Sequence, residues 1–213
     1  MMFGTMRACL NRFVVVAAMS IAATAMVGCT ASVPRNIDNA CEIFRENRDW
    51  YRAGSRARER WGTPIDIQLA IVHQESAFRP KAKPARRRFL WIFPGSRPSN
   101  AYGYAQALDS TWDGYRKATG HRGADRDDFA DAVDFIGWYT AQSRKVCGIG
   151  SNDAFSLYLA YHEGNGGFRR GTYRGKSWLV DVARRVERRA SRYRTQLAGC
   201  EKEFKRRRFL WIF

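Results

Sequence analysis

The sequence predicts an all-α protein, and three observations support that prediction. Apolar side chains recur every three to four residues through most of the chain, the spacing that gives a helix one apolar face. The alternation of apolar and polar residues that a half-buried strand needs is nearly absent. Between residues 80 and 102, four prolines interrupt any regular element, which leaves room for at most a small irregular hairpin or loop insertion.

Capping residues locate the helices along the chain. Asp109 can cap one helix, Asp127 or Asp128 a second, and Ser151 or Asn152 a third, because their side chains accept hydrogen bonds from the first backbone N–H groups. Together with the apolar spacing, they predict helices at residues 41–61 (with a break near 47–49), 109–120, 128–147, 154–162 and 177–203.

One further helix, expected over residues 63–79, is the one around which the others are organised. Thr63 can act as its N-cap and Pro64 suits its first turn, whereas Pro80 cannot continue it. Glu75 lies near its C-terminal end.

The surroundings of Glu75 predict an unusual carboxyl group. Ile71 and Val72 lie one turn before it and Ile67 two turns before, so the carboxyl projects from a mainly apolar face. Partial burial raises the pKa of an unpaired glutamate, and a glutamate that is still protonated near neutrality can act as a general acid. On this helix alone, a glutamate facing solvent is an equally open alternative.

Residues 1–28 are predicted to be an export signal. They contain Arg7 and Arg12, no acidic residue, and a run of apolar and small residues over 13–27 that is short for a membrane span. The run ends in the string MVGC, which resembles the lipobox of bacterial lipoproteins and implies cleavage before Cys29 and lipid attachment to it.

The position after the lipidated cysteine predicts a location. Thr30, rather than an aspartate, follows Cys29, which resembles lipoproteins that are sorted to the outer membrane and face the periplasm. Residues 29–40 would then form a tether between lipid and domain. An ordinary secreted protein cut after a small residue is the alternative.

The charge predicts an anionic partner. The chain has a formal net charge of +17, and removal of residues 1–28 takes away two arginines, which leaves +15. Nucleic acid is not expected as a partner of an exported protein. Phospholipid head groups and the carboxylate-rich cell wall are the remaining candidates.

The cysteines predict one disulfide. Cys41, Cys147 and Cys200 remain once the leader and the lipidated cysteine are set aside, and an oxidising compartment permits one bridge among them. Three pairings are open. Cys41 with Cys200 is favoured, because that bridge would tie the first and last helices of the domain together. The chain has no CxxC motif and only three histidines, so neither a metal site nor a cofactor is expected.

The octapeptide RRRFLWIF occurs twice, from Arg86 to Phe93 and from Arg206 to Phe213. Three cations followed by five large apolar residues suit an interfacial membrane contact, with the arginines at lipid phosphates. The alternative is that the apolar half of the first copy packs over the domain.

Three separated strings resemble one family. They are HQESAF around Glu75, SNAYGYAQ at residues 99–106 and LAYHEG at residues 159–164. In this order they resemble the E-S, G-L-M-Q and A-Y-N-A-G motifs of the SLT lytic transglycosylases. The resemblance implies a lysozyme-like fold, of the goose-type lysozyme and SLT kind, over residues 41–205, with residues 206–213 as a basic and aromatic tail.

The resemblance also implies an activity, cleavage of the MurNAc-GlcNAc bond of peptidoglycan. Glycosidases usually need two carboxylates, but a lytic transglycosylase needs one because the C6 hydroxyl of the sugar replaces water. Glu75 would first protonate the glycosidic oxygen and then accept the C6 proton. The product would carry a 1,6-anhydro-MurNAc end.

Further residues acquire expected roles from the motifs. Ser76 would support the turn after the acid, Ser99 would contact the acid or the acetamido group, and Gln106 would bind substrate or fix the cleft wall. The hydroxyl of Tyr161 would orient Glu75. The full set expected at the substrate is Ser76, Ser99, Tyr102, Gln106, Tyr161 and Glu163. For Ser99, Gln106 and Tyr161, a purely structural hydrogen bond is the alternative.

The chain departs from the motifs at two places. Tyr104 and Ala105 replace leucine and methionine, and His162 and Glu163 replace asparagine and alanine. Glu163 introduces a second carboxylate, which would make the protein a hydrolytic muramidase if it activated water. A lipoprotein that binds peptidoglycan without cleaving it is the other alternative.

Overall fold

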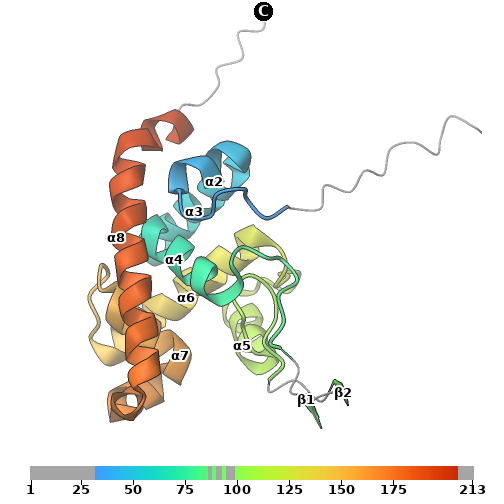
Figure 1. Cartoon of the computed structure of the whole chain (residues 1–213), viewed down its shortest axis with the longest axis vertical. Coiled ribbons are helices and arrows are strands. Elements are labelled where there is room, and N and C mark those ends of the chain that lie inside the picture. Colours follow the sequence, from blue (N-terminus) through green and yellow to red (C-terminus); the bar gives the residue numbers. More distant parts are fainter. Residues whose placement is uncertain (1–31, 86–87, 90–92, 95–98, 206–213) are drawn as a thin grey trace, which may run out of the picture. The chain divides into compact units, whose positions relative to one another are not determined.

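A computed structural model describes residues 32–85, 88–89, 93–94 and 99–205, and Figure 1 shows these as coloured ribbon. The chain divides into a first unit, Met1–Ala31, and a second that begins at Ser32. Cys29 and the octapeptide copy from Arg206 to Phe213 lie outside the described residues, and so does most of the first copy. The predictions made for them therefore stay predictions.

The described part is helical, which confirms the all-α prediction. Its α-helices are α2 Ala40–Glu46, α3 Arg48–Trp61, α4 Ile65–Ser76, α5 Asp109–Thr119, α6 Phe129–Cys147, α7 Ala154–Arg170 and α8 Ser177–Lys205, with a 3-10 turn, η1, at Thr172–Gly175. A small hairpin, the most that the sequence was expected to allow between residues 80 and 102, is also present. Two short antiparallel strands, β1 Arg88–Phe89 and β2 Phe93–Pro94, pair Phe89 with Phe93.

The helices start within a residue or two of the predicted positions, but of the predicted caps only Asp128 is confirmed; Asp153, rather than Ser151 or Asn152, caps α7. The expected break in the first helix falls at Asn47, and Asp128 caps α6 by accepting a hydrogen bond from the N–H of Asp131. Helix α5 starts one residue from the prediction, because Leu108 occupies the N-cap and Asp109 the first turn. Helix α7 continues to Arg170 rather than ending near residue 162, since the chain resumes helical geometry after a kink.

Helix α4 is a core helix, not merely an amphipathic one. All eight residues from Ile65 to Val72 are buried, and the helix packs against α8, α6 and α3 (Figure 1). Asp66, the one acidic residue in that run, forms an ion pair with Arg194 of α8 at 2.8 Å. A helix enclosed on all sides cannot rotate or shift easily, so it holds the position of Glu75.

The ends of α4 differ from the prediction. Thr63 does not cap the helix; its hydroxyl lies 2.7 Å from that of Thr140, and Pro64 occupies the N-cap. The helix ends at Ser76 rather than at residue 79, because Ala77 and Phe78 adopt left-handed backbone angles. Phe78 is fully buried, and its burial in the core draws the chain out of the helical path.

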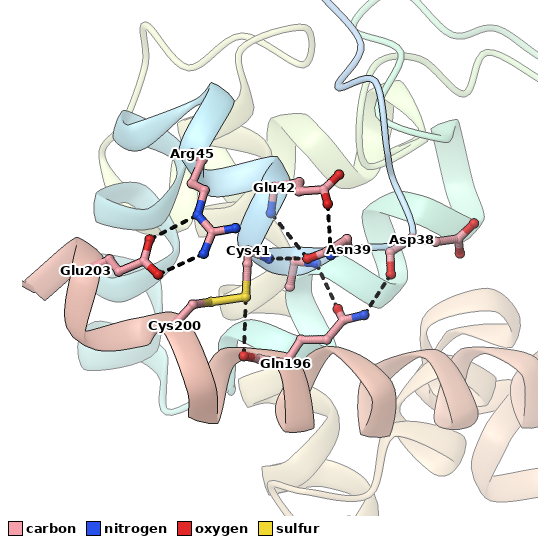
Figure 2. Close-up of a disulfide and its surroundings, with 9 residues drawn as sticks. Asp38, Asn39, Cys41, Glu42, Arg45, Gln196, Cys200 and Glu203 are labelled. Carbon is pink, nitrogen blue, oxygen red and sulfur yellow. Dashed lines mark hydrogen bonds and ion pairs between the residues drawn. A yellow bond between two sulfur atoms is a disulfide. The ribbon is translucent and has the colours of Figure 1, made fainter.

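A disulfide joins the first and last helices, as predicted. Cys41 of α2 and Cys200 of α8 are bridged, with their Cα atoms 6.0 Å apart. Figure 2 shows the bridge beside an ion pair between Arg45 and Glu203. Closing a loop of 159 residues stabilises the fold by about 5 kcal/mol on the chain-entropy account. Among the described cysteines, Cys147 is unpaired.

None of the helices in the described ranges combines the length and the apolar character that a membrane span requires.

Candidate active site

A cleft of about 460 Å³ brings the three sequence motifs together. Its walls come from the end of α4, the loop before α5, and helices α5, α6 and α7. The lining residues are Glu75, Ala101, Gln106, Ala107, Leu108, Thr111, Phe135, Tyr139, Tyr161, His162, Glu163 and Gly164. Of the residues predicted to act at the substrate, Glu75, Gln106, Tyr161 and Glu163 lie in this cleft.

Glu75 is placed as the sequence predicted. The residue is partly exposed to the cleft, but its Oε1 atom is enclosed and has no hydrogen-bond partner within the described part of the chain. Burial raises the pKa of the carboxyl group to about 7, and a hydrogen bond with the hydroxyl of Tyr158 partly opposes that rise. Near neutral pH the carboxyl group is therefore protonated in a large share of molecules.

Tyr158 is the tyrosine that faces the acid, and the sequence did not identify it. The hydroxyl of Tyr161, which was expected to orient Glu75, instead donates a hydrogen bond to the carbonyl of Ala105 at 2.7 Å. Tyr158 lies one helical turn before Tyr161 on α7, so both rings lie on the same side of that helix. The sequence signal that could have identified Tyr158 is its spacing of three residues from Tyr161, which places the two tyrosines on the same side of one helix.

The loop before α5 is held in one geometry by its own backbone. Gly103 has a φ of +79°, and a Cβ atom there would lie 1.9 Å from the carbonyl oxygen of Arg126. Only glycine fits such a position. Gln106 lines the cleft, yet its side-chain N–H group donates to the carbonyls of Gly103 and Ala82, each at 2.9 Å. Gln106 thus fixes the cleft wall, one of its two expected roles.

Two serines expected at the substrate do not line the cleft. The hydroxyl of Ser76 is buried and donates to the carbonyl of Val72, one turn back in α4, at 3.1 Å. Ser99 accepts a hydrogen bond from the N–H of Ala101 at 3.4 Å and so supports the turn before the loop. Both hydroxyls bond to backbone groups nearby, which fits the turn-supporting role expected of Ser76 and the structural alternative given for Ser99.

Tyr102 also lies elsewhere than predicted. Its hydroxyl donates to Asp127 at 3.0 Å, and the cations of Lys83 and Arg126 lie over its ring. It lines a separate cavity of about 350 Å³, which Lys83, Asp109 and Arg126 also line, and not the cleft that contains Glu75.

Glu163 is an ionised carboxylate with its oxygens already occupied. Lys176 donates to both oxygens, at 2.8 and 2.9 Å, and Thr172 donates to one at 2.5 Å. His162 lies 3.2 Å from the other oxygen. The hydrogen bonds from Lys176 and Thr172 lower the pKa of Glu163 to about 2. A carboxylate with so low a pKa is a weak base, which matters for the choice between one and two catalytic carboxylates.

Comparison with known proteins identifies one family. The chain matches the family model described as Transglycosylase SLT domain over residues 17–200, which is most of its length. No curated protein matches the chain.

Proposed function

Because the chain belongs to the Transglycosylase SLT domain family of peptidoglycan lytic transglycosylases, we propose that it cleaves the MurNAc-GlcNAc bond with Glu75 as the catalytic residue. The observation that carries this assignment is the state of Glu75: a carboxyl group enclosed at the wall of a cleft, with its pKa raised to about 7. Only a carboxyl group that is protonated at working pH can donate the proton that the leaving oxygen requires.

The proposed reaction uses Glu75 twice. Its carboxyl group protonates the glycosidic oxygen as the bond from that oxygen to C1 of MurNAc breaks, and the 2-acetamido group of MurNAc stabilises the positive charge on C1. The Glu75 carboxylate then accepts the proton of the C6 hydroxyl as that oxygen bonds to C1. The product is a 1,6-anhydro-MurNAc end, and the carboxyl group is again protonated. No water is consumed.

The state of Glu163 favours this single-carboxylate route over hydrolysis. A hydrolytic muramidase needs a second carboxylate that takes a proton from water. Glu163 lines the same cleft, but Lys176, Thr172 and His162 occupy its oxygens and its pKa is about 2. It contributes a fixed negative charge to the cleft instead.

The decisive experiment uses the full chain purified in mild detergent and isolated peptidoglycan sacculi. The wild type is expected to release fragments with anhydro ends, and Glu75→Gln is expected to release none. Glu59→Gln, an exposed glutamate on α3, is the matched control and should behave as the wild type. Full activity in Glu75→Gln would refute the assignment. Binding of sacculi by the wild type without new chain ends would indicate a non-catalytic binding protein.

We also propose that the protein is an outer-membrane lipoprotein anchored through Cys29, with the two RRRFLWIF copies as additional membrane contacts. The MVGC string and the basic, aromatic octapeptides support this proposal. Growth with labelled palmitate should label the wild type but not Cys29→Ala. A wild type that takes up no label, or that fractionates without the outer membrane, would refute it.

A further inference from the structure

One cluster of positive charge has no role in the proposed reaction. Residues 169–194 contain ten lysines and arginines but only two acidic residues, Asp181 and Glu187. This segment comprises the end of α7, η1 and the first half of α8. The segment therefore carries +8 of the chain's formal net charge of +17, so a large share of the excess of cations is local.

On α8, helical spacing places Trp178 and Arg185 on one side of the helix and Arg184 on another. Trp178 and Arg185 are seven residues apart and therefore lie along one line of the helix. Arg184 lies about 100° away around the axis. We call the line formed by Trp178 and Arg185 the α8 rim.

The α8 rim adjoins the catalytic cleft. The ring of Trp178 lies 5.3 Å from that of His162, a residue of the cleft wall. Trp178 is 55% exposed, more than the other large apolar side chains that are exposed in the described residues. Burial raises the pKa of Tyr158, the tyrosine beside Glu75, and the positive charge of Arg185 acts on it in the opposite direction. The rim thus begins at the cleft wall, and the charge of Arg185 acts on the tyrosine that lies beside Glu75.

The charge of Arg185 has no ion-pair partner in the described part of the protein. Arg185 is exposed and forms no ion pair with any described residue, although Asp181 lies one turn before it. Arg189, one turn further along, is partly buried; burial lowers its pKa, Tyr193 and Asp38 oppose that, and the charges of Arg192 and Arg185 lower it further. Arg192 is paired with Asp38 at 3.4 Å, so Arg185 is the cation of the rim that an anionic ligand would stabilise.

We propose that the α8 rim binds the carboxylates of the short peptides attached to the glycan strand in the cleft, with Arg185 as the residue that recognises them. The inference rests on the proposed function and deepens it. A glycan strand that lies in the cleft carries its peptides outward past the cleft edge, and those peptides have several free carboxylates. Arg185 pairs with such a carboxylate through two N–H groups, and Trp178 supplies an apolar surface beside it.

A peptide fits this surface better than a membrane does. Trp178 packs against His162 of the cleft wall, so the rim is continuous with the cleft in which the glycan would lie. The start of the second unit packs about two turns further along α8 than Arg185. There Tyr193 donates a hydrogen bond to the carbonyl of Ile37, and Arg192 pairs with Asp38. A ligand attached to the bound glycan therefore reaches the rim without any contact between the protein and a membrane.

The test compares two substrates with the full chain in mild detergent at low salt. One substrate is soluble glycan strands that retain their peptides, and the other is the same strands after an amidase has removed the peptides. Arg185→Ala is expected to raise KM for the peptide-bearing strands about fivefold, with kcat unchanged, and to leave KM for the bare strands unchanged. Arg185→Lys should recover part of the loss, and added salt should reduce the difference.

Arg184→Ala is the matched control. It removes the same exposed, unpaired charge from the same helix on another side, and it should leave both KM values unchanged. An equal rise in KM on both substrates, or no rise on either, would overturn the proposal. So would Arg185→Ala losing binding to phosphatidylglycerol vesicles while keeping its KM values. If the wild type cleaves neither substrate, the proposed function fails instead, and the two failures are distinct.

Discussion

The two glutamates of the cleft stand in opposite states. Glu75, at the end of the buried helix α4, has an oxygen without a hydrogen-bond partner among the described residues and a pKa raised to about 7. Glu163, on α7, receives hydrogen bonds from Lys176 and Thr172 and has a pKa lowered to about 2. The residue type is the same, so the surroundings alone decide which one holds a proton at neutral pH.

The difference also explains why a second carboxylate does not imply a second catalyst. The lysine beside Glu163 keeps that carboxylate charged and engaged, whereas the apolar core around α4 keeps Glu75 neutral and available. We therefore expect a substitution of Glu75 to lower activity much more than one of Glu163. We also expect the two substitutions to change the free energy of unfolding in opposite directions.

The largest expected effect is on activity. Glu75→Gln should lower kcat by about 10³-fold or more, because the proton donor is lost. Glu163→Gln should lower it by less than about 10-fold, since it removes only a fixed charge. Initial rates on peptidoglycan measure both, and circular dichroism checks that both variants are folded. Equal losses in the two variants would contradict the assignment of a single catalytic carboxylate.

The second effect is on stability: at pH 8, Glu75→Gln should raise the free energy of unfolding and Glu163→Gln should lower it. The native pKa of Glu75 is raised, so the wild type loses stability as the pH rises from about 4.5 to about 7. Glu75→Gln should therefore be more stable than the wild type at pH 8, by at most about 3 kcal/mol, with no gain at pH 4.

Glu163 has a lowered pKa, and its contribution to stability is present above about pH 4.5 and is lost as the pH falls toward 2. Glu163→Gln should be about 1 to 3 kcal/mol less stable at pH 8, because Lys176 loses its partner. Urea denaturation at the two pH values measures both differences. If Glu75→Gln were less stable than the wild type at pH 8, burial would not be destabilising the ionised carboxyl group of Glu75, and this explanation of its raised pKa would be wrong.

The smallest effect separates the two tyrosines. The activity, as kcat/KM, should fall as the pH rises through about 7, where Glu75 loses its proton. The hydrogen bond from Tyr158 lowers that pKa, so Tyr158→Phe should shift the fall to higher pH by less than about one unit. Tyr161→Phe removes a hydroxyl that is bonded to Ala105 and should leave the position of the fall unchanged. A shift in Tyr161→Phe alone would reverse the two roles.

The helices were predictable from local rules, and the disulfide from the order of the helices along the chain. Apolar spacing and caps such as Asp128 depend only on neighbours in the sequence, and the pairing of Cys41 with Cys200 followed from the positions of the first and last helices. The apolar residues on its own helix face left Glu75 an open candidate, and its resemblance to the E-S motif, with the two other motifs in order, singled it out. Local patterns of this kind are independent of how the helices pack.

The differences arose where packing decides. The motif placed Tyr161 at the acid, whereas the hydroxyl of Tyr158 bonds to Glu75 and that of Tyr161 to the carbonyl of Ala105. The rotation of α7 about its axis, which decides between the two, depends on contacts with α6 and α8. Lys176, which determines the state of Glu163, lies thirteen residues away in the sequence, and no motif connects the two.

The mass of the released fragments tests the central claim most directly, namely that Glu75 acts without a second catalytic carboxylate. Digestion of sacculi by the wild type and by Glu163→Gln, followed by mass spectrometry, distinguishes anhydro ends from hydrated ones by one water. We predict that both proteins release only anhydro fragments. Hydrated fragments from the wild type that disappear in Glu163→Gln would contradict the claim and would make Glu163 the base of a hydrolase.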